Sequence, residues 1–259
     1  MNPHGGSPTD ALASSGDTSD ALHVLLARLA LAHAILASNG HDDLTLGHMA
    51  LRDPQGRGFW MKRSGTAMDE ISPDRDFLLI AFDGQVVEGN GRRHAEWPIH
   101  AELMRARADV LVSAHTHPEY ATLLSAFGAS IRPLTTDGGY LGEVRCVHIA
   151  GSHIDTPARG MEVARALGDR RAVLLRNHGA VFCGRSIEQA TLIGVYLERA
   201  ARAELRVRSV SGIPIPASPE DVAGRAEMIE SDRWLVDSFD CLARRAGAAS
   251  CLPGVQGRR

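Results

Sequence analysis

The chain has 259 residues, 44% of them hydrophobic, and a formal net charge of −3 at pH 7. This length allows a sizeable core, most simply in one α/β domain. The net charge is small and neither sign forms a long block, so the sequence lacks the basic patches typical of proteins that bind nucleic acid or an anionic membrane. We therefore expect a small-molecule partner.

The two ends differ from the body of the chain. Residues 1–18 are mainly Gly, Ser, Pro, Thr and Asp, which predicts a disordered N-terminal tail without an export signal. Residues 247–259 are predicted to form a flexible C-terminal tail, which leaves one domain at 19–246. We see no apolar stretch of membrane-spanning length, and the four cysteines include no C-x-x-C pair. These features favour a protein of a reducing cytoplasm, without a membrane partner.

The first half of the domain predicts one helix followed by a strand meander. Apolar residues in 21–37 recur at helical spacing, and Ser38-Asn39-Gly40 can adopt the left-handed conformation that ends a helix. Short β-type runs follow at 49–52, 58–62 and 77–82, separated by turn dipeptides, which is typical of antiparallel strands. Pro98 suits the first turn of another helix, so Glu96 is expected at or just before a helix N-terminus.

The second half alternates strands and helices. Residues 110–117 predict a strand, followed by strands at 143–149, 172–175 and 180–183 and a short amphipathic helix at 160–167. His178 then lies at a turn between strands. Ser186 and Gln189 form a capping-box pattern at the start of a long helix that ends near residue 206. Ser218-Pro219 is expected to open one last helix, which ends near residue 245.

The pair His115 and His117 is the strongest chemical signal in the chain. Residues i and i+2 of a strand share a face, so two imidazoles at this spacing can converge on one metal ion. His178 offers a third imidazole, since Gly179 permits a tight turn that aims the ring into a cleft. Taken singly, the pair could be incidental, His178 a polar turn residue and Glu96 a carboxylate that complements a helix dipole. Their occurrence in one chain favours a site.

These motifs together resemble the class II aldolase/adducin family, which includes fuculose-phosphate aldolase. The resemblance rests on Glu96-Trp97 with His100, on His115-Thr116-His117 nineteen residues after the glutamate, and on 174–179, and it covers residues 21–210. It implies a three-layer α/β/α single domain with a largely antiparallel central sheet, usually assembled as a homotetramer with active sites between subunits. It also implies that His115, His117 and His178 bind one divalent metal ion per subunit, Zn, Mn, Fe or Co, with Glu96 as the acid/base residue.

This assignment makes chemical sense. Three neutral imidazoles leave a divalent ion with positive charge and open positions, so the ion can stabilise an enolate-type intermediate. Glu96 can take or return the proton, and partial burial would raise its pKa toward the working range. The resemblance further implies that such a glutamate can contact the metal in the resting state.

Departures from the sugar-phosphate pattern indicate the substrate. The phosphate-binding Gly-Asn turn is replaced by Gly47-His48, and two serines before the glutamate are replaced by His94-Ala95. The chain thus lacks the small amide and hydroxyl groups that hydrogen-bond a phosphate, which argues against a phosphorylated sugar as the substrate. Where aldolases present a tyrosine to the neighbouring subunit's site, this chain has Asp137 and, three residues further on, Tyr140. The candidate substrate-binding residues are His48, Ser64, Gly65, His94 and Tyr140. The alternative for the two histidines is an ordinary surface role.

The runs Gly47-His48-Met49 and Phe59-Trp60-Met61-Lys62 resemble the branch of the family that decarboxylates aromatic acids. Lys62 is the only lysine, a composition that indicates a GC-rich bacterial genome. We therefore expect a metal-dependent carbon–carbon lyase, a decarboxylase or an aldolase, that acts on a non-phosphorylated hydroxy or aromatic acid. Two alternatives stay open. One is a non-haem iron oxygenase that oxidatively decarboxylates a prenylated hydroxyphenylpyruvate-type acid, and the other is an adducin-like binding module without catalysis.

Overall fold

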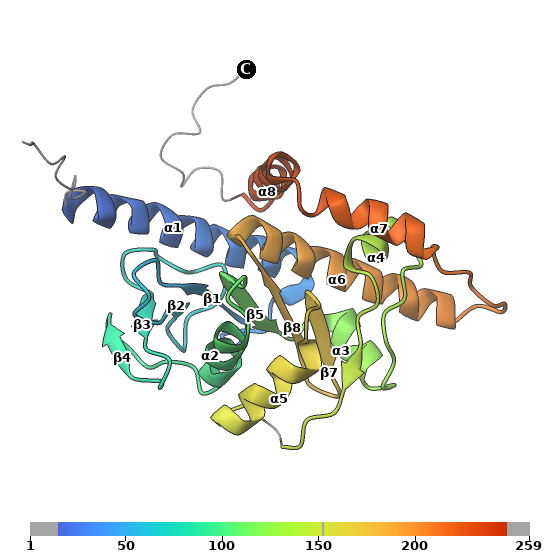
Figure 1. Ribbon diagram of the computed structural model, residues 1–259, viewed down its shortest axis with the longest axis horizontal. Helices are drawn as coiled ribbons and strands as arrows, with labels where there is room; N and C mark the ends of the chain where they lie inside the picture. Colours follow the sequence, from blue (N-terminus) through green and yellow to red (C-terminus); the bar gives the residue numbers. More distant parts are fainter. Residues whose placement is uncertain (1–14, 152, 248–259) are drawn as a thin grey trace, which may run out of the picture.

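The computed structural model describes residues 15–151 and 153–247 (Figure 1). Most of the two predicted tails lies outside these residues. The first helix begins at Ser15, inside the segment expected to be a tail, and not near Ser19.

One eight-stranded sheet forms the centre of the domain, in the order β4-β3-β2-β1-β5-β8-β7-β6. All neighbouring strands are antiparallel except β6 and β7, which confirms a largely antiparallel sheet. The strands are β1 (His48–Arg52), β2 (Phe59–Lys62), β3 (Phe77–Ile80), β4 (Val86–Glu88), β5 (Val112–Thr116), β6 (Cys146–Val147), β7 (Ala172–Leu175) and β8 (Gly179–Gly184). The pairing places β5 between β1 and β8, in the middle of the sheet.

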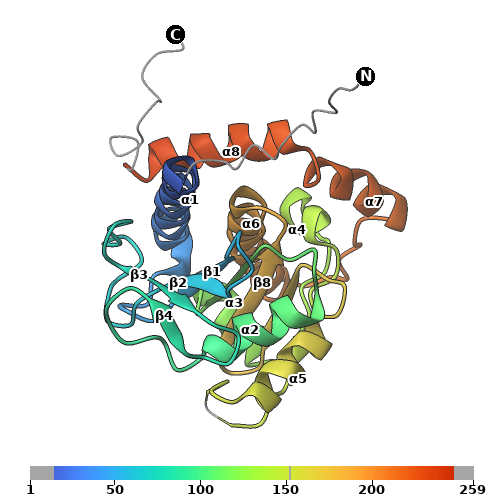
Figure 2. The same ribbon diagram turned by 60° about the vertical axis from the view of Figure 1, so that its left-hand side comes forward.

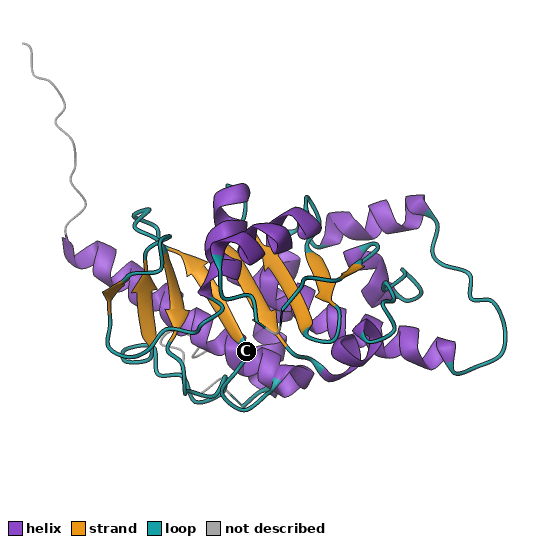
Figure 3. Ribbon diagram, turned by 90° about the horizontal axis from the view of Figure 1, so that it is seen from below, coloured by secondary structure: helices purple, strands orange, loops and turns teal. Residues whose placement is uncertain are grey.

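Helices cover both faces of this sheet, as expected for three layers (Figure 3). They are α1 (Ser15–Leu36), a π-helical turn η1 (Ala37–His41), α2 (Trp97–Ala106), α3 (Glu119–Ser125), α4 (Thr136–Leu141), α5 (Pro157–Leu167), α6 (Ile187–Arg208), α7 (Pro219–Met228) and α8 (Asp232–Arg245). Helices α2 and α5 pack together against one face, while α1 and α6 pack together over the other and α8 lies on both of them (Figure 2). The sequence patterns did not predict the short elements β4, α3 and α4.

The alternation of side chains along each strand builds two cores. On β1, Met49 and Leu51 belong to the core under α1 and α6, whereas Ala50 belongs to the core under α2 and α5. On β5 the same rule sends Val112 and Ala114 to the first core. Ser113 and His115 therefore point to the α2 face, which is where the candidate site forms.

The predicted last helix is two helices, α7 and α8, separated by residues 229–231. Two tertiary contacts hold the residues at this break. The Gln189 side chain donates to the Ile229 carbonyl at 2.8 Å, and the Glu230 carboxylate accepts from Arg185 at 3.1 Å. The capping pattern before α6 is also modified: Ser186 accepts from the Gln189 N–H, but the Gln189 side chain accepts from the Arg185 N–H. Gln189 therefore joins the start of α6 to the turn before α8.

Helix α1 corrects one expectation about membranes. Residues 20–41 are long and apolar enough, by length and composition alone, to cross a bilayer, so the expectation that no stretch reaches spanning length is wrong. In this fold the apolar face of α1 belongs to the core, since Leu29 and Ile35 are fully buried there. His33 is also buried, and its Nε2 accepts from the Met49 N–H at 3.0 Å, which ties α1 to β1. Gly40 ends the helical region with φ of 91°, as predicted.

Candidate metal centre

Four side chains from distant parts of the sequence meet at the end of β5. They are Glu96, His115, His117 and His178, and one donor atom from each lies within 4.8 Å of the others. Glu96 directly precedes α2, His115 lies in β5, His117 follows it, and His178 lies in the turn between β7 and β8. Three imidazole nitrogens and one carboxylate form a donor set that suits a divalent transition metal. The cluster could therefore hold such an ion.

The outer ring nitrogens orient the imidazoles. Nδ1 of His115 donates to the Ala180 carbonyl at 3.0 Å, and Nδ1 of His117 donates to Oδ2 of Asp43 at 2.7 Å. Both histidines thus present a bare Nε2 to the centre, where these two atoms are 3.1 Å apart. Asp43 was not predicted, because it contacts His117 across 74 positions of sequence and no motif marks it.

Glu96 is held as an ionised carboxylate. It is only 8% exposed, and its two oxygens lie 3.3 Å from His115 Nε2 and 3.5 Å from His178 Nε2. Oε1 also accepts from the Ile154 N–H at 2.8 Å. Burial acts to raise the pKa of Glu96, as expected, but the adjoining His115, the Ile154 N–H and His178 outweigh burial and hold this pKa well below its ordinary value. The expectation that the pKa rises toward the working range is therefore wrong.

Two of the histidines, His117 and His178, favour the neutral, ligating form. Burial, with the neighbouring His115 next in importance, lowers the pKa of His178 to about 4. The same two causes lower the pKa of His117, although Asp43 acts in the opposite direction. A neutral imidazole keeps the lone pair that a metal ion requires.

The turn that carries His178 works differently from the prediction. The left-handed residue is Asn177, with φ of 58°, and not Gly179. Gly179 is needed for space, because a Cβ there would lie 2.5 Å from the Thr116 carbonyl oxygen and 2.7 Å from Cδ2 of the His117 ring. The glycine therefore allows β8 to approach a candidate metal ligand closely.

Two of the predicted substrate-binding residues lie beside the cluster. His48 is 2% exposed and is paired with His115 across β1 and β5, with the ring centroids 5.5 Å apart. His94 is 8% exposed, and its Nε2 accepts from Nζ of Lys62 at 3.2 Å. The rings of His48 and His94 are 4.6 Å apart. A surface role is therefore excluded for both residues.

The remaining predicted residues are not brought to the cluster. The Ser64 N–H donates to the Arg92 carbonyl at 2.8 Å, so the exposed turn Ser64-Gly65 lies beside the segment that leads to His94. Tyr140 is 9% exposed and packs against Tyr196 and Trp234, with ring centroids 4.9 Å and 5.3 Å away. This aromatic cluster lies among α4, α6 and α8, on the other side of the sheet, so Tyr140 does not reach the metal cluster of its own subunit. Its role toward a neighbouring subunit's site stays a prediction.

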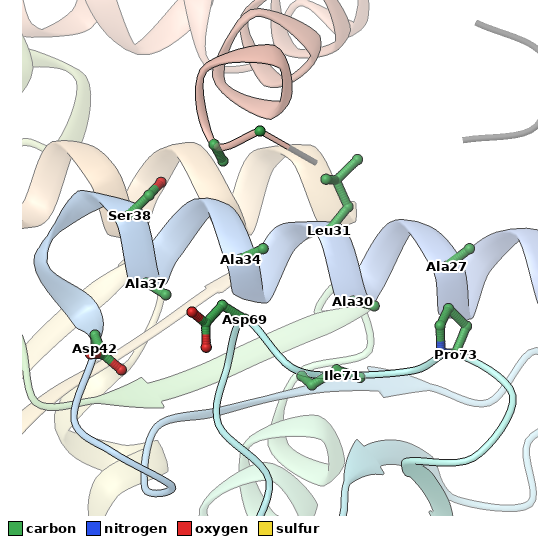
Figure 4. A pocket seen from close by; sticks show the side chains of 12 residues that line it. Ala27, Ala30, Leu31, Ala34, Ala37, Ser38, Asp42, Asp69, Ile71 and Pro73 are labelled. Carbon is green, nitrogen blue, oxygen red and sulfur yellow. The ribbon is translucent and has the colours of Figure 1, made fainter. Parts of the chain in front are cut away.

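A cavity of about 300 Å³ adjoins the cluster. It is lined by His148, Ile149, Gly151, Ile154, Leu175, Arg176, Asn177 and His178. A larger groove, about 550 Å³, runs along α1 beside the loop that contains Asp69 and Ile71 (Figure 4). Five of its twelve lining residues are alanine, and it contains none of the four clustered residues. We therefore regard the smaller cavity as the approach to the site.

Comparison with known proteins agrees with this geometry. The chain is 31% identical over 202 residues to 3,4-dihydroxyphthalate decarboxylase of Arthrobacter keyseri, a match that covers 71% of this chain and 79% of that protein. It is 28% identical over 202 residues to a 4-hydroxy-3-prenylphenylpyruvate oxygenase/4-hydroxy-3-prenylbenzoate synthase of Streptomyces roseochromogenus subsp. oscitans, covering 76% and 72%.

A solved structure shows the same fold. An aldolase II superfamily protein from Pseudomonas syringae superposes with a TM-score of 0.77 at 22% identity, covering 93% of this chain and 96% of that one. Residues 27–205 match the family model described as the class II aldolase and adducin N-terminal domain. The chain belongs to the class II aldolase and adducin N-terminal domain family.

Proposed function

We propose that this protein is a metal-dependent carbon–carbon lyase that decarboxylates a non-phosphorylated hydroxy or aromatic acid. The observation that carries the proposal is the convergence of Glu96 with His115, His117 and His178 within 4.8 Å. The similarity to 3,4-dihydroxyphthalate decarboxylase supports decarboxylation among the reactions of this family. A bound divalent ion, Zn, Mn, Fe or Co, would supply Lewis acidity toward a chelating oxygen of the substrate.

The histidines and Glu96 would then have different roles in the reaction. Two of the imidazoles are fixed by their outer partners, His115 by the Ala180 carbonyl and His117 by Asp43, so these two rings need little reorganisation when substrate binds. Glu96 is held in place by the Ile154 N–H and is ionised, so it is in the form that accepts a proton, although its lowered pKa makes it a weak base. Because Glu96 and His115 are buried, bulk water has little access to the reacting atoms.

The surroundings favour an acid over a phosphorylated sugar. The ammonium of Lys62 is fully buried and committed to the carbonyls of Thr45 and Thr66, each at 2.8 Å, and to His94. It therefore has no N–H left for a phosphate dianion. Arg176, by contrast, is exposed and lines the cavity beside His178, where its guanidinium could bind a carboxylate.

The test is release of carbon dioxide under argon from 3,4-dihydroxyphthalate and a panel of hydroxy acids, with the protein loaded in turn with each metal. We expect release by the wild type and a fall of about 10²-fold or more in Glu96→Gln, the usual range for an acid/base residue. His23→Ala serves as the control, since His23 is a half-exposed residue that pairs with Asp74 at a distance from the site. Absence of release from every acid with every metal would refute decarboxylation.

A second candidate is an iron-dependent oxygenase, favoured by the similarity to the prenylphenylpyruvate oxygenase. Oxygen uptake by the iron-loaded protein in the presence of a 2-oxo acid, with no product under argon, would favour it over the lyase. A non-catalytic module is disfavoured because all four clustered residues are retained. We also propose a homotetramer, on the family resemblance, which sedimentation analysis would test.

A further inference from the structure

His48 lies next to the metal cluster without belonging to it. It is the cross-strand partner of His115, so the two side chains share the α2 face of the sheet. Its Nδ1 lies 2.8 Å from Nε2 of His100, and Nδ1 of His100 lies 2.7 Å from Oγ of Ser113. Ser113, His100 and His48 thus form a buried hydrogen-bonded chain, which we name the serine–histidine relay.

The hydroxyl at one end of the relay decides where the protons lie. Among the described residues, the only partner of Ser113 Oγ is Nδ1 of His100, and we assign the hydroxyl hydrogen to this bond because the opposite direction would leave the buried O–H without an acceptor. His100 then carries its own hydrogen on Nε2 and donates it to Nδ1 of His48. His48 must therefore carry its hydrogen on Nε2.

This assignment holds for neutral imidazoles, and burial favours the neutral form, since His100 is fully buried and His48 is only 2% exposed. No carboxylate is hydrogen-bonded to either ring within residues 15–151 and 153–247, so neither imidazolium is stabilised by a direct partner.

The Nε2–H of His48 is the free end of the relay. It has no hydrogen-bond acceptor in the part of the chain that the structure describes. The nitrogen is nevertheless not completely enclosed by protein, so a bound molecule can reach it. The His94 ring, 4.6 Å away, cannot take this role, because its Nε2 already accepts from Lys62. An N–H donor next to a ligand histidine, without an acceptor of its own, is suited to bind an oxygen of the substrate.

We propose that Ser113 and His100 fix His48 as an Nε2–H donor that binds an anionic oxygen, a carboxylate or a phenolate, next to the metal site. His48 is then the substrate-binding residue, while His100 and Ser113 are positioning residues. The inference rests on the proposed function for the class of acid, but the proton positions do not depend on it.

The first test is imidazole nitrogen NMR of the zinc-loaded protein with isotope-labelled histidine. We expect His48 and His100 each to show a protonated Nε2 and a bare Nδ1. In Ser113→Ala the preference of both rings should weaken, and Ser113→Thr, which keeps the hydroxyl, should restore it. A wild-type His48 protonated on Nδ1 would overturn the proposal, and no substrate is needed to observe it.

The second test is titration of the zinc-loaded protein with phthalate, with metal content measured in every variant. His48→Leu should bind phthalate about 10- to 100-fold more weakly, the range for a hydrogen bond to a charged group. His48→Gln, which places an amide N–H near the same position, should recover part of this loss. Ser113→Ala should weaken binding without loss of zinc.

The outcomes separate this inference from the proposed function. Equal phthalate affinity in His48→Leu and the wild type, at equal zinc content, would refute the role of His48. If phthalate binding follows the relay but no acid releases carbon dioxide, the relay stands and the lyase proposal fails.

Discussion

The hydrogen bond between Asp43 and His117 gives a sharp test of the site. At 2.7 Å, it fixes the His117 ring so that Nε2 points to the cluster. Loss of such an outer partner typically costs 10- to 100-fold in metal affinity. The Asp43 side chain is 36% exposed, so solvent screens the interaction and we expect the lower end of this range, about tenfold or ~1.4 kcal/mol.

The assay is competition for zinc between the protein and a chromogenic chelator. Affinity should fall in the order wild type, Asp43→Asn, Asp43→Ala, since asparagine can still accept the hydrogen bond but lacks the charge. Asp42→Asn is the matched control, because Asp42 is the adjacent carboxylate but lines the groove along α1. Equal zinc affinity in Asp43→Ala and the wild type would refute the orienting role.

Three further predictions concern the walls of the site. Gly179→Ala should weaken zinc binding and cost about 1–3 kcal/mol of stability, because the new Cβ meets the His117 ring. The control Gly224→Ala, which has open space around the new Cβ, should do neither. Equal melting temperatures of Gly179→Ala and the wild type would contradict this prediction. Arg176→Gln should weaken phthalate binding several-fold at unchanged zinc content, measured by titration, and unchanged binding would remove Arg176 from the site. Burial lowers the pKa of Lys62 to about 8, so between that pH and its ordinary value of 10.5 the unfolded state holds more protons than the folded state. The free energy of unfolding of the wild type, measured by urea denaturation, should therefore rise with pH in this window relative to that of Lys62→Met, by on the order of 3 kcal/mol in total. If the free energies of the two proteins changed in parallel with pH, the prediction would be contradicted.

Local patterns predicted the parts of the site that depend on local geometry. The i, i+2 spacing of His115 and His117 placed both imidazoles near one point, and Pro98 placed Glu96 at the start of α2. These two features follow from backbone geometry, which a single sequence contains. Turn dipeptides between the β-type runs predicted antiparallel strands, whereas the largely antiparallel sheet with two covered faces was implied by the family resemblance.

The features that the sequence did not predict depend on contacts between residues far apart in the chain. Asp43 reaches His117, and the Ile154 N–H reaches Glu96, only because the chain folds back on itself. The break between α7 and α8 depends on Gln189, which bonds the Ile229 carbonyl across 40 positions. Tyr140 packs against Tyr196 and Trp234, away from the metal cluster of its own subunit, a placement that its position in the sequence does not predict.

The most direct test of the central claim is metal analysis of the protein purified without chelators, comparing the wild type with His115→Ala, His178→Ala and the control His23→Ala. The four-residue cluster predicts one divalent ion per chain in the wild type and the control, and loss of that ion in the other two variants. Folding of each variant is checked by circular dichroism. Stoichiometric metal in folded His115→Ala and His178→Ala would contradict the account.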